Sequence, residues 1–187
     1  MDDQELVSQA QAGDQDSFAE LVRRHHAWVQ GLCAATLRDA ASAEDAAQEV
    51  FLKAYKSLAR FKGESSFSTW LHRIAVNVCL DLLRGRSRNR TESWDELVEK
   101  EGDRIGRLLA APAPEHSAED ADLVARVLEQ LPPEYRLVLT LREVQGLSYE
   151  EIAGAMDCSL DSVKARLQRA RKEFTDRLRH FLDPLSV

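Results

Sequence analysis

The sequence contains no long apolar run and no recognisable targeting segment. No stretch approaches the roughly 20 consecutive apolar residues that a transmembrane helix requires. The first residues, MDDQELVSQAQ, are acidic and polar, which is unlike a secretory signal. These absences exclude membrane insertion as an expectation and predict a cytoplasmic protein.

Cysteine is scarce, and the groupings that metal or redox chemistry needs are missing. Cys33, Cys79 and Cys158 form no CxxC pair, so we expect reduced thiols, as in the cytoplasm. The His25-His26 pair has no further ligands at metal-binding spacing. No acid–base pair or activated nucleophile is recognisable either. The sequence therefore predicts no metal, no cofactor, no catalytic residues and no enzymatic activity.

Charge is unevenly distributed along the 187 residues, whose net charge is −7. Residues 61–90 carry six bases against two acids and residues 158–187 carry seven against four, whereas residues 91–121 carry nine acids against three bases. Proteins that bind DNA alone are usually basic, because neutralising phosphates supplies most non-specific affinity. Two basic islands in an acidic chain predict a protein that binds DNA weakly by itself and needs a partner.

Helical periodicity dominates the sequence, with apolar residues recurring at spacings of three and four and few patterns typical of strands. Residues 91–121 lack an apolar face, are acidic and contain Pro112 and Pro114, which is typical of a linker. We therefore predict an all-α protein of two small helical domains, residues 1–90 and 122–187, joined by a flexible acidic linker over 91–121. The second domain is expected to end in a helix-turn-helix.

The N-terminal part is expected to form a helix over residues 4–12, a second helix capped by Asp16, and a third from Ser42 to Leu58 after a loop over 38–43. The third helix has a clear apolar stripe, formed by Ala47, Val50, Phe51, Ala54 and Leu58. Its other face is polar but includes Leu52. Such a face is either solvent-exposed surface or a partner-binding surface, and periodicity does not decide between them.

Residues 60–70 form a polar segment in which aromatic and basic residues alternate, and a helix begins near Ser68 or Thr69. On that helix Leu71, Ile74, Ala75, Val78 and Leu82 form the expected core side, while Trp70, Arg73, Asn77 and Arg84 fall on the other side. Aromatic and cationic side chains beside a Ser-rich loop suit single-stranded nucleic acid. In the alternative interpretation, Phe67 and Trp70 cover the core and Arg73 is a surface charge.

Residues 148–171 have the pattern of two short helices joined by a tight turn. Ser148 and Glu151 have capping-box spacing, Asp157-Cys158 interrupts the apolar pattern, and Ser159 can cap the second helix. The second helix has an apolar side and a basic side. This pattern indicates a helix-turn-helix whose second helix enters the DNA major groove. The alternative is a helical hairpin with a solvated basic face.

Two long segments resemble one known family. AEDAAQEVFLKAYKSLARFKGESSFSTWLHRIAVN (residues 43–77) resembles region 2 of sigma-70 family RNA polymerase sigma factors, in the extracytoplasmic-function (ECF) branch. LEQLPPEYRLVLTLREVQGLSYEEIAGAMDCSLDSVKARLQRAR (residues 128–171) resembles region 4 of the same branch. No counterpart of the additional regions of larger sigma factors is recognisable. The resemblance implies a transcription initiation factor that directs core RNA polymerase to promoters.

The resemblance also implies roles for individual residues. A surface for core polymerase is expected at Asp45, Gln48, Glu49, Leu52 and Lys53. Melting and recognition of the −10 element are expected at Lys62, Ser65, Ser66, Phe67, Thr69, Trp70, Arg73 and Asn77. Recognition of the −35 element is expected at Ser162, Lys164, Ala165, Arg166, Gln168, Arg169 and Arg171, with Arg166 and Arg171 on phosphates.

The partners implied are core RNA polymerase, through its largest-subunit clamp helices and its flap, promoter DNA and an anti-sigma factor that holds the protein until a stress or other signal arrives. The acidic linker would occupy the channel that the third region fills in larger relatives. Two other functions remain open from the residues alone. One is a two-domain helix-turn-helix regulator that binds operators without polymerase, and the other is an interaction protein without DNA contact.

Overall fold

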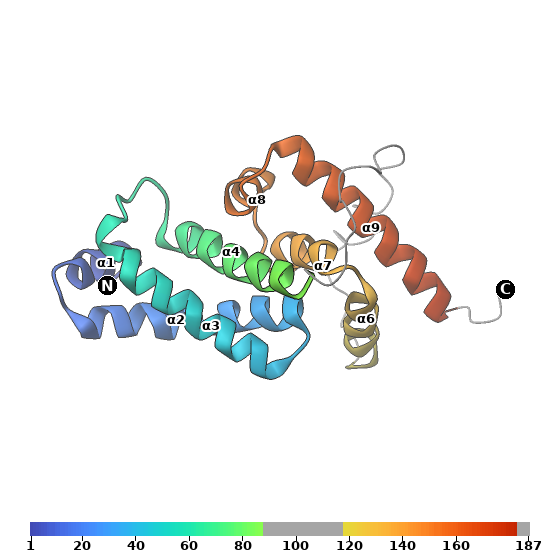
Figure 1. Ribbon diagram of the computed structural model, residues 1–187, viewed down its shortest axis with the longest axis horizontal. Coiled ribbons are helices and arrows are strands. Elements are labelled where there is room, and N and C mark those ends of the chain that lie inside the picture. The colour runs from blue at the N-terminus through green and yellow to red at the C-terminus, as the bar shows by residue number, and fades with distance from the viewer. Residues whose placement is uncertain (88–117, 183–187) are drawn as a thin grey trace.

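A computed structural model describes residues 1–87 and 118–182, with side chains described for 1–85 and 123–181. Within these ranges every element is helical and no strand occurs, so the predicted all-α class is confirmed (Figure 1). The predicted linker lies almost entirely outside the described residues. The helices are α1 (Asp3–Gln11), α2 (Gln15–Leu37), α3 (Ala40–Ser57), the 3-10 turn η1 (Leu58–Arg60), α4 (Phe67–Ser87), α6 (Ala118–Gln130), α7 (Pro133–Leu139), the π-helical turn η2 (Thr140–Val144), α8 (Tyr149–Met156) and α9 (Leu160–Leu182).

Short polar side chains determine where the N-terminal helices begin. Asp14, not Asp16 as predicted, caps α2 by accepting from the Asp16 backbone N–H. Similarly, α3 begins at Ala40 and not at Ser42, because the Asp39 carboxylate accepts from both the backbone N–H and the hydroxyl of Ser42. The predicted loop over 38–43 is therefore shorter, because Asp39 and Ser42 were both possible caps and spacing alone did not select between them.

The core of the N-terminal half is built as predicted from α2, α3 and α4. All five residues of the predicted α3 stripe, Ala47, Val50, Phe51, Ala54 and Leu58, are buried. On α4, Leu71, Ala75 and Val78 are buried as expected. However, α4 also buries His72, Val76, Cys79 and Leu80, which the predicted core side did not include. This helix therefore has a second buried side.

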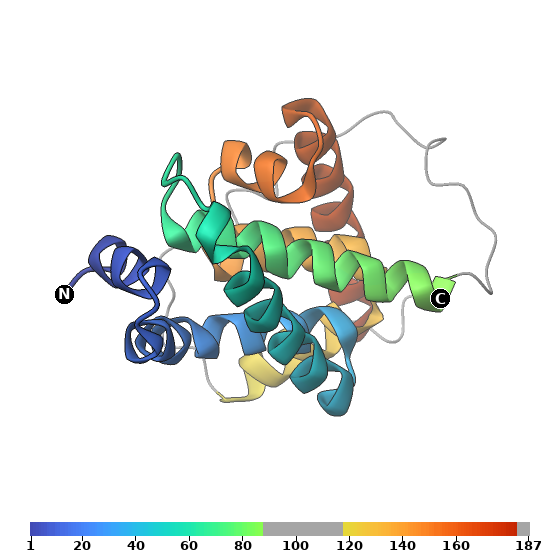
Figure 2. The same ribbon diagram turned by 60° about the vertical axis from the view of Figure 1, so that its left-hand side comes forward.

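Two neighbours account for this second buried side of α4: Trp28 and Cys33 of α2 contact His72 and Cys79, and the C-terminal half packs against the same helix. Figures 1 and 2 show α4 between the N-terminal helices and the C-terminal helices α7 and α8, and α4 contacts α8 as extensively as it contacts α3. Two exposed ion pairs also connect the halves, Arg38 Nη2 to Glu129 Oε2 at 3.8 Å and Arg73 Nη2 to Asp157 Oδ1 at 4.0 Å. The two halves form one closed body.

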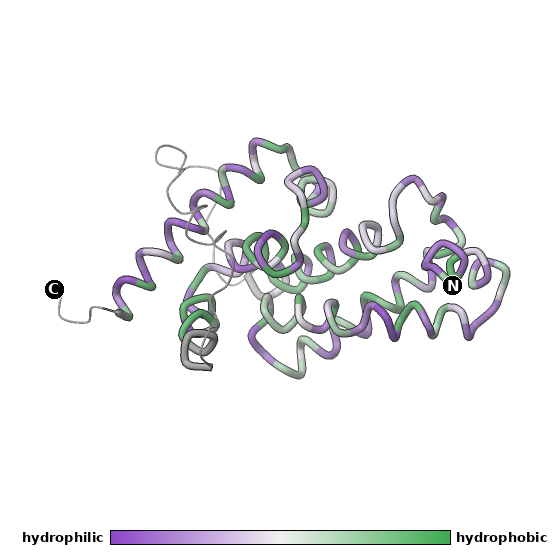
Figure 3. Tube along the Cα trace, turned by 180° about the vertical axis from the view of Figure 1, so that it is seen from behind, coloured by the Kyte–Doolittle hydropathy of each residue, from purple (hydrophilic) through white to green (hydrophobic). Residues whose placement is uncertain are grey.

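The C-terminal half consists of α6, α7 with η2, α8 and α9, which matches the four predicted helices. Val127, Leu137, Leu141 and Ile152 are buried, and α9 contributes Val163, Leu167, Ala170 and Phe174. Hydrophilic and hydrophobic residues alternate along α9, as expected for a helix that is buried on one side (Figure 3). No helix of the described residues is long and apolar enough to cross a membrane.

Candidate polymerase and nucleic-acid interfaces

The helix-turn-helix of α8 and α9 is specified by local hydrogen bonds. The Ser148 hydroxyl accepts from the Glu151 N–H at 3.1 Å, and the Glu151 carboxylate accepts from the Ser148 N–H at 2.8 Å, which forms the predicted capping box. This bonding holds the pKa of Glu151 below its usual value. Asp157 ends α8 in a left-handed conformation (φ 51°), and Ser159 accepts from the Ser162 N–H at the start of α9. The turn therefore orients α9 through contacts that all lie between residues 148 and 162.

The side of α9 opposite its buried residues presents the predicted −35 set. Lys164 is exposed, while Ser162, Ala165, Gln168 and Arg169 are half-buried and lie on the same outer side. The Lys164 ammonium lies 3.7 Å from Asp161 Oδ1, so its charge is partly balanced by an exposed carboxylate. The face combines a cation, an amide and a guanidinium, the groups that read base edges in the major groove.

The two arginines predicted on phosphates already have partners within the chain. Arg171 Nη2 lies 2.7 Å from Glu143 Oε1, and both side chains are largely shielded from solvent. The Nη1 of Arg166 donates to the Cys158 sulfur at 3.5 Å. Phosphate contact by either residue would require exchange of these partners, and their role stays a prediction.

The predicted −10 segment is organised around three aromatic rings. The centroids of Phe61 and Trp70 are 4.9 Å apart, and those of Phe67 and Trp70 are 5.6 Å apart. Phe61 and Phe67 are buried, whereas Trp70 is half-buried. Direct contact between Phe67 and a base is therefore inconsistent with this conformation, and the alternative in which Phe67 covers the core describes its position. Trp70 keeps one part of its ring accessible beside Arg73 and Asn77, which are exposed.

The polar residues of the same segment lie at the surface. Lys62, Ser65 and Ser66 are exposed. The Ser66 hydroxyl accepts from the Thr69 N–H at 3.0 Å and also contacts the Thr69 hydroxyl at 2.8 Å, so Ser66 caps α4 and the helix begins at Phe67. Contact of these two hydroxyls with DNA would compete with the cap.

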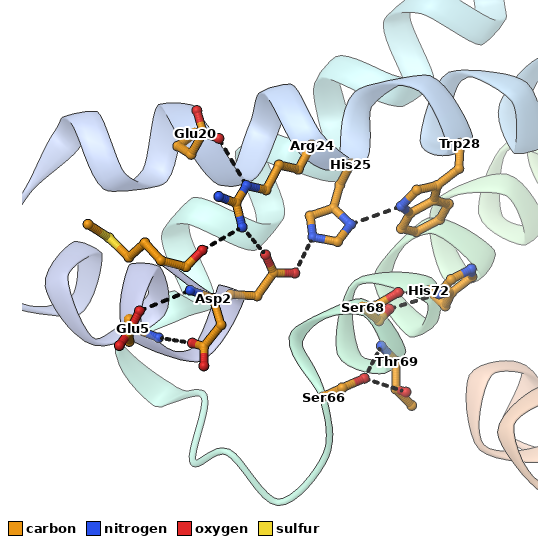
Figure 4. Close-up of polar contacts among 12 residues, drawn as sticks. Asp2, Glu5, Glu20, Arg24, His25, Trp28, Ser66, Ser68, Thr69 and His72 are labelled. Carbon is orange, nitrogen blue, oxygen red and sulfur yellow. Dashed lines mark hydrogen bonds and ion pairs between the residues drawn. The ribbon is translucent and has the colours of Figure 1, made fainter.

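A buried network that the sequence analysis missed lies behind this surface (Figure 4). Trp28 Nε1 donates to His25 Nδ1 at 3.0 Å, which leaves the His25 proton on Nε2, where it faces Asp3 Oδ2 at 2.7 Å. The Trp28 ring stacks on His72 at 3.9 Å, and His72 Nδ1 donates to the Ser68 carbonyl at 2.8 Å. The network thus connects α1, α2 and the start of α4.

His72 is the titratable member of this network at the contact between the two halves. Its Nε2 is buried and makes no hydrogen bond of normal geometry. Burial lowers the pKa of His72, although the Ser68 carbonyl, Gln145 and Glu151 act in the opposite direction. The ring is therefore neutral at neutral pH.

The predicted polymerase-binding residues share one side of α3. Asp45, Gln48, Leu52 and Lys53 are exposed and Glu49 is half-buried, with Lys53 Nζ 2.9 Å from Glu49 Oε1. Leu52 is 52% exposed, and Tyr55, which the sequence analysis did not select, is 50% exposed and packs its ring on Phe18 at 4.9 Å. Leu52 and Tyr55 are three residues apart on α3, so their exposed side chains are neighbours on the helix surface.

The cysteines and metal-ligand types form no recognisable chemical site in the described parts. The Cys79 thiol donates to the Cys33 sulfur at 3.9 Å inside the core, and this bond together with burial raises the pKa of Cys79. All three cysteines are free thiols. No group of three or more potential metal ligands gathers among the described residues.

Comparison with known proteins assigns both halves to one family. Residues 21–89 match the description of sigma-70 region 2, and residues 121–174 match that of sigma-70 region 4. The RNA polymerase sigma-H factor of Pseudomonas aeruginosa is 38% identical over 185 residues, which cover 96% of this chain and 95% of the relative. The ECF RNA polymerase sigma-E factor of Escherichia coli is 39% identical over 180 residues, covering 94% of each chain.

Solved structures show the same fold over nearly the whole chain. CnrH, in complex with the cytosolic domain of CnrY, has a TM-score of 0.66 at 28% identity and covers 98% of this chain and 99% of its own. The sigma factor RpoE of Bartonella quintana, in complex with the anti-sigma factor NepR, has a TM-score of 0.65 at 23% identity and covers 87% and 96% of the two chains. This chain belongs to the ECF branch of the sigma-70 family, and it is a non-enzymatic initiation factor that directs RNA polymerase to promoters.

Proposed function

We propose that the exposed and half-buried residues predicted from the sequence perform the three contacts of promoter-directed initiation, while the buried Phe67 supports the −10 surface from the core. The α3 side around Leu52 binds core polymerase, the loop after η1 with the outer side of α4 captures the −10 element, and the outer side of α9 reads the −35 element. The observation that carries this assignment is the conjunction on one chain of an exposed, mainly polar α3 surface around Leu52 and a capped, basic recognition helix. The boundaries 1–90, 91–121 and 122–187 remain our proposed domain division.

Binding of both promoter elements requires the closed body to open. The elements are named for positions about 25 base pairs apart, which is roughly 85 Å of duplex at about 3.4 Å per base pair. In the closed body, Arg73 on the −10 surface lies 4.0 Å from Asp157, next to the recognition helix. That helix is only about 35 Å long at 1.5 Å per residue. The two halves must therefore separate, and polymerase supplies the surface on which they do so.

The closed body also suits control by an anti-sigma factor. The CnrH and Bartonella RpoE structures are those of complexes, the first with the cytosolic domain of CnrY and the second with the anti-sigma factor NepR, and this chain has their fold over almost its whole length. A partner that binds across both halves would keep the −10 surface beside α8. Because core polymerase and promoter DNA are cytoplasmic, we place the action of this protein in the cytoplasm.

Reconstituted transcription tests the function directly. Purified core polymerase should initiate at a specific promoter only when this chain is added. A regulator that acts without replacing a sigma subunit would instead bind its operator alone and leave core polymerase inactive. Initiation that does not depend on the chain would contradict the proposal.

The polymerase surface has its own test. The double variant Gln48→Ala with Leu52→Asp places a carboxylate where an apolar contact is expected, so co-purification with core polymerase should be lost. Arg23→Ala, an exposed change on the neighbouring helix α2 and outside the predicted set, is the matched control. An unchanged melting temperature would show that the double variant is folded, and retained polymerase binding would remove α3 from the proposal.

A further inference from the structure

The N-terminal helix α1 contacts the proposed −10 loop at its start. This loop, residues 61–66, connects η1 to α4. Gln11, the last residue of α1, lies at the surface, yet its side-chain amide turns inward and donates from Nε2 to the carbonyl oxygens of Leu58 and Phe61, each at 2.8 Å. Because the Phe61 N–H also donates to the Leu58 carbonyl at 3.0 Å, one amide group closes the turn from which the loop departs.

The ring of Phe61 connects this hydrogen-bonded turn to Trp70, the candidate base-stacking residue. Phe61 is buried, and its centroid lies 4.9 Å from that of Trp70. A shift of the Phe61 backbone would therefore move the wall against which Trp70 packs. Cores of this density transmit such displacements instead of absorbing them.

A second α1 glutamine reaches the loop near its middle. Gly63 has a φ of +73°, a conformation that L side chains rarely adopt, and a Cβ on it would lie 3.2 Å from Nε2 of Gln4. Gln4 and Gln11 are seven residues apart, so they lie on the same side of α1 two helical turns from each other. One side of this short helix thus faces the loop, bonded to its start through Gln11 and close to its middle at Gln4.

Other side chains of α1 hold this helix against α2. Asp3 faces His25 at 2.7 Å and Arg24 at 3.1 Å, while Leu6 and Val7 are buried. Through Trp28 and His72 the same network reaches the Ser68 carbonyl, just beyond the far end of the loop. Helix α1 is therefore anchored on α2. It contacts the start of the loop directly and is connected to the far end through Trp28 and His72.

We propose that α1 is a brace that sets the shape of the 61–66 loop for capture of an unpaired −10 base, with Gln11 as its principal positioning residue. This inference rests on the proposed −10 role of the loop. The brace depends on a specific group: the carbonyl oxygens of Leu58 and Phe61 need an amide donor at the length of a glutamine side chain. Glutamate has the same shape but cannot donate, and asparagine can donate but is one methylene shorter.

The test compares Gln11→Glu and Gln11→Asn in the full chain bound to core polymerase. The readouts are affinity for a fluorescent single-stranded oligonucleotide of the −10 non-template strand and affinity for a −35 duplex. Both variants should bind the single strand about 5- to 30-fold more weakly, the range expected when bonds to buried acceptors are lost. Duplex binding should stay within twofold. Gln15→Glu, an exposed residue with the same charge change, should bind both DNAs like the native chain.

The possible results separate the brace from the function on which it depends. Native single-strand affinity in both Gln11 variants would overturn the brace, and equal losses of single-strand affinity, duplex affinity and melting temperature would show a merely structural role. If Gln11→Glu does not fold, Gln11→Asn and Gln4→Ala still decide the question. A native holoenzyme that fails to bind the −10 strand would overturn the proposed role of the loop itself.

Discussion

The two candidate DNA-binding parts of this molecule are constructed in different ways. The helix-turn-helix is local: its cap, its left-handed Asp157 and the cap of α9 all lie between residues 148 and 162. The −10 surface is assembled from α1, α2 and the contiguous 61–66 loop and α4, through contacts between distant residues such as Gln11 and Phe61 or Asp3 and His25. One is specified by neighbours in sequence and the other by tertiary packing.

This difference predicts how the two parts respond to amino-acid substitutions. A rigid local motif can read a rigid duplex, whose groove is already formed. Capture of unpaired bases needs a pocket that holds its shape while the strand around it opens, at a cost of a few kcal/mol for unstacking. We therefore expect single substitutions to act widely in the N-terminal half and narrowly in the C-terminal half.

The largest expected effect comes from removing the central ring of the distributed network. Trp28→Ala loses the stack on His72 and the bond to His25, and deletion of a large packed ring typically costs about 3 kcal/mol. Hydrogen exchange should accelerate at the amides of α2 and α4 but not at those of α9. Trp28→Phe, which keeps most of the ring, should cost less. Equal acceleration in α9 would mean that the two halves unfold as one unit.

The same difference explains how much could be predicted from the sequence. The Ser148 capping box, the turn at Asp157 and the basic side of α9 follow from short spacings, so the structure confirms them. The burial of Phe67, the second buried side of α4 and the His25–Trp28–His72 network depend on which helices meet, which periodicity does not encode. Gln11 has no local signal at all, since a glutamine at a helix end is ordinary until its acceptors 47 and 50 residues away are known.

The second effect concerns base recognition by the local motif. If Arg169 pairs with a guanine, Arg169→Ala should weaken −35 binding by roughly 1–3 kcal/mol and relax the preference at one base pair. Arg179→Ala removes an exposed charge two to three turns further along α9 and serves as the matched control. Binding of both variants to a panel of −35 duplexes measures the affinity and the base preference. An unchanged preference would remove Arg169 from the recognition set, while −10 strand affinity should be unaffected in either case.

A pH effect is expected in the distributed part. Because burial lowers the pKa of His72, the unfolded chain binds a proton near pH 6.5 that the folded chain does not. Stability should therefore fall as the pH drops below this value, by at most about 1.4 kcal/mol per pH unit. Urea unfolding at pH 7.5, 6.5 and 5.5 measures this change in the free energy of unfolding. The lowered pKa of Glu151 affects stability only at more acidic pH. His72→Gln should therefore reduce the dependence of stability on pH between 5.5 and 7.5. An unchanged dependence would show that another group causes it.

A smaller effect should follow from breaking the local cap. Ser148→Ala leaves the Glu151 N–H without its acceptor and should cost about 1 kcal/mol of stability. The loss should appear in −35 binding, since the start of α8 orients the turn, and not in −10 strand binding. Ser148→Thr preserves a hydroxyl acceptor and should restore most of the loss. An equal effect on both DNA elements would argue that the cap stabilises the closed body as a whole.

The smallest effect tests what holds the two differently built parts together. The Arg73–Asp157 pair is 4.0 Å long, with side chains 59% and 87% exposed, and such pairs contribute roughly 0.2–1 kcal/mol. Asp157→Asn keeps a residue type that tolerates the left-handed conformation while removing the charge. The distance between the two halves should therefore change little, because α4 packs against α8 of the C-terminal half without this ion pair. Energy transfer between dyes placed on α3 and α9 measures closure. A large opening in Asp157→Asn would show instead that one surface charge, and not apolar packing, keeps the promoter-reading halves together.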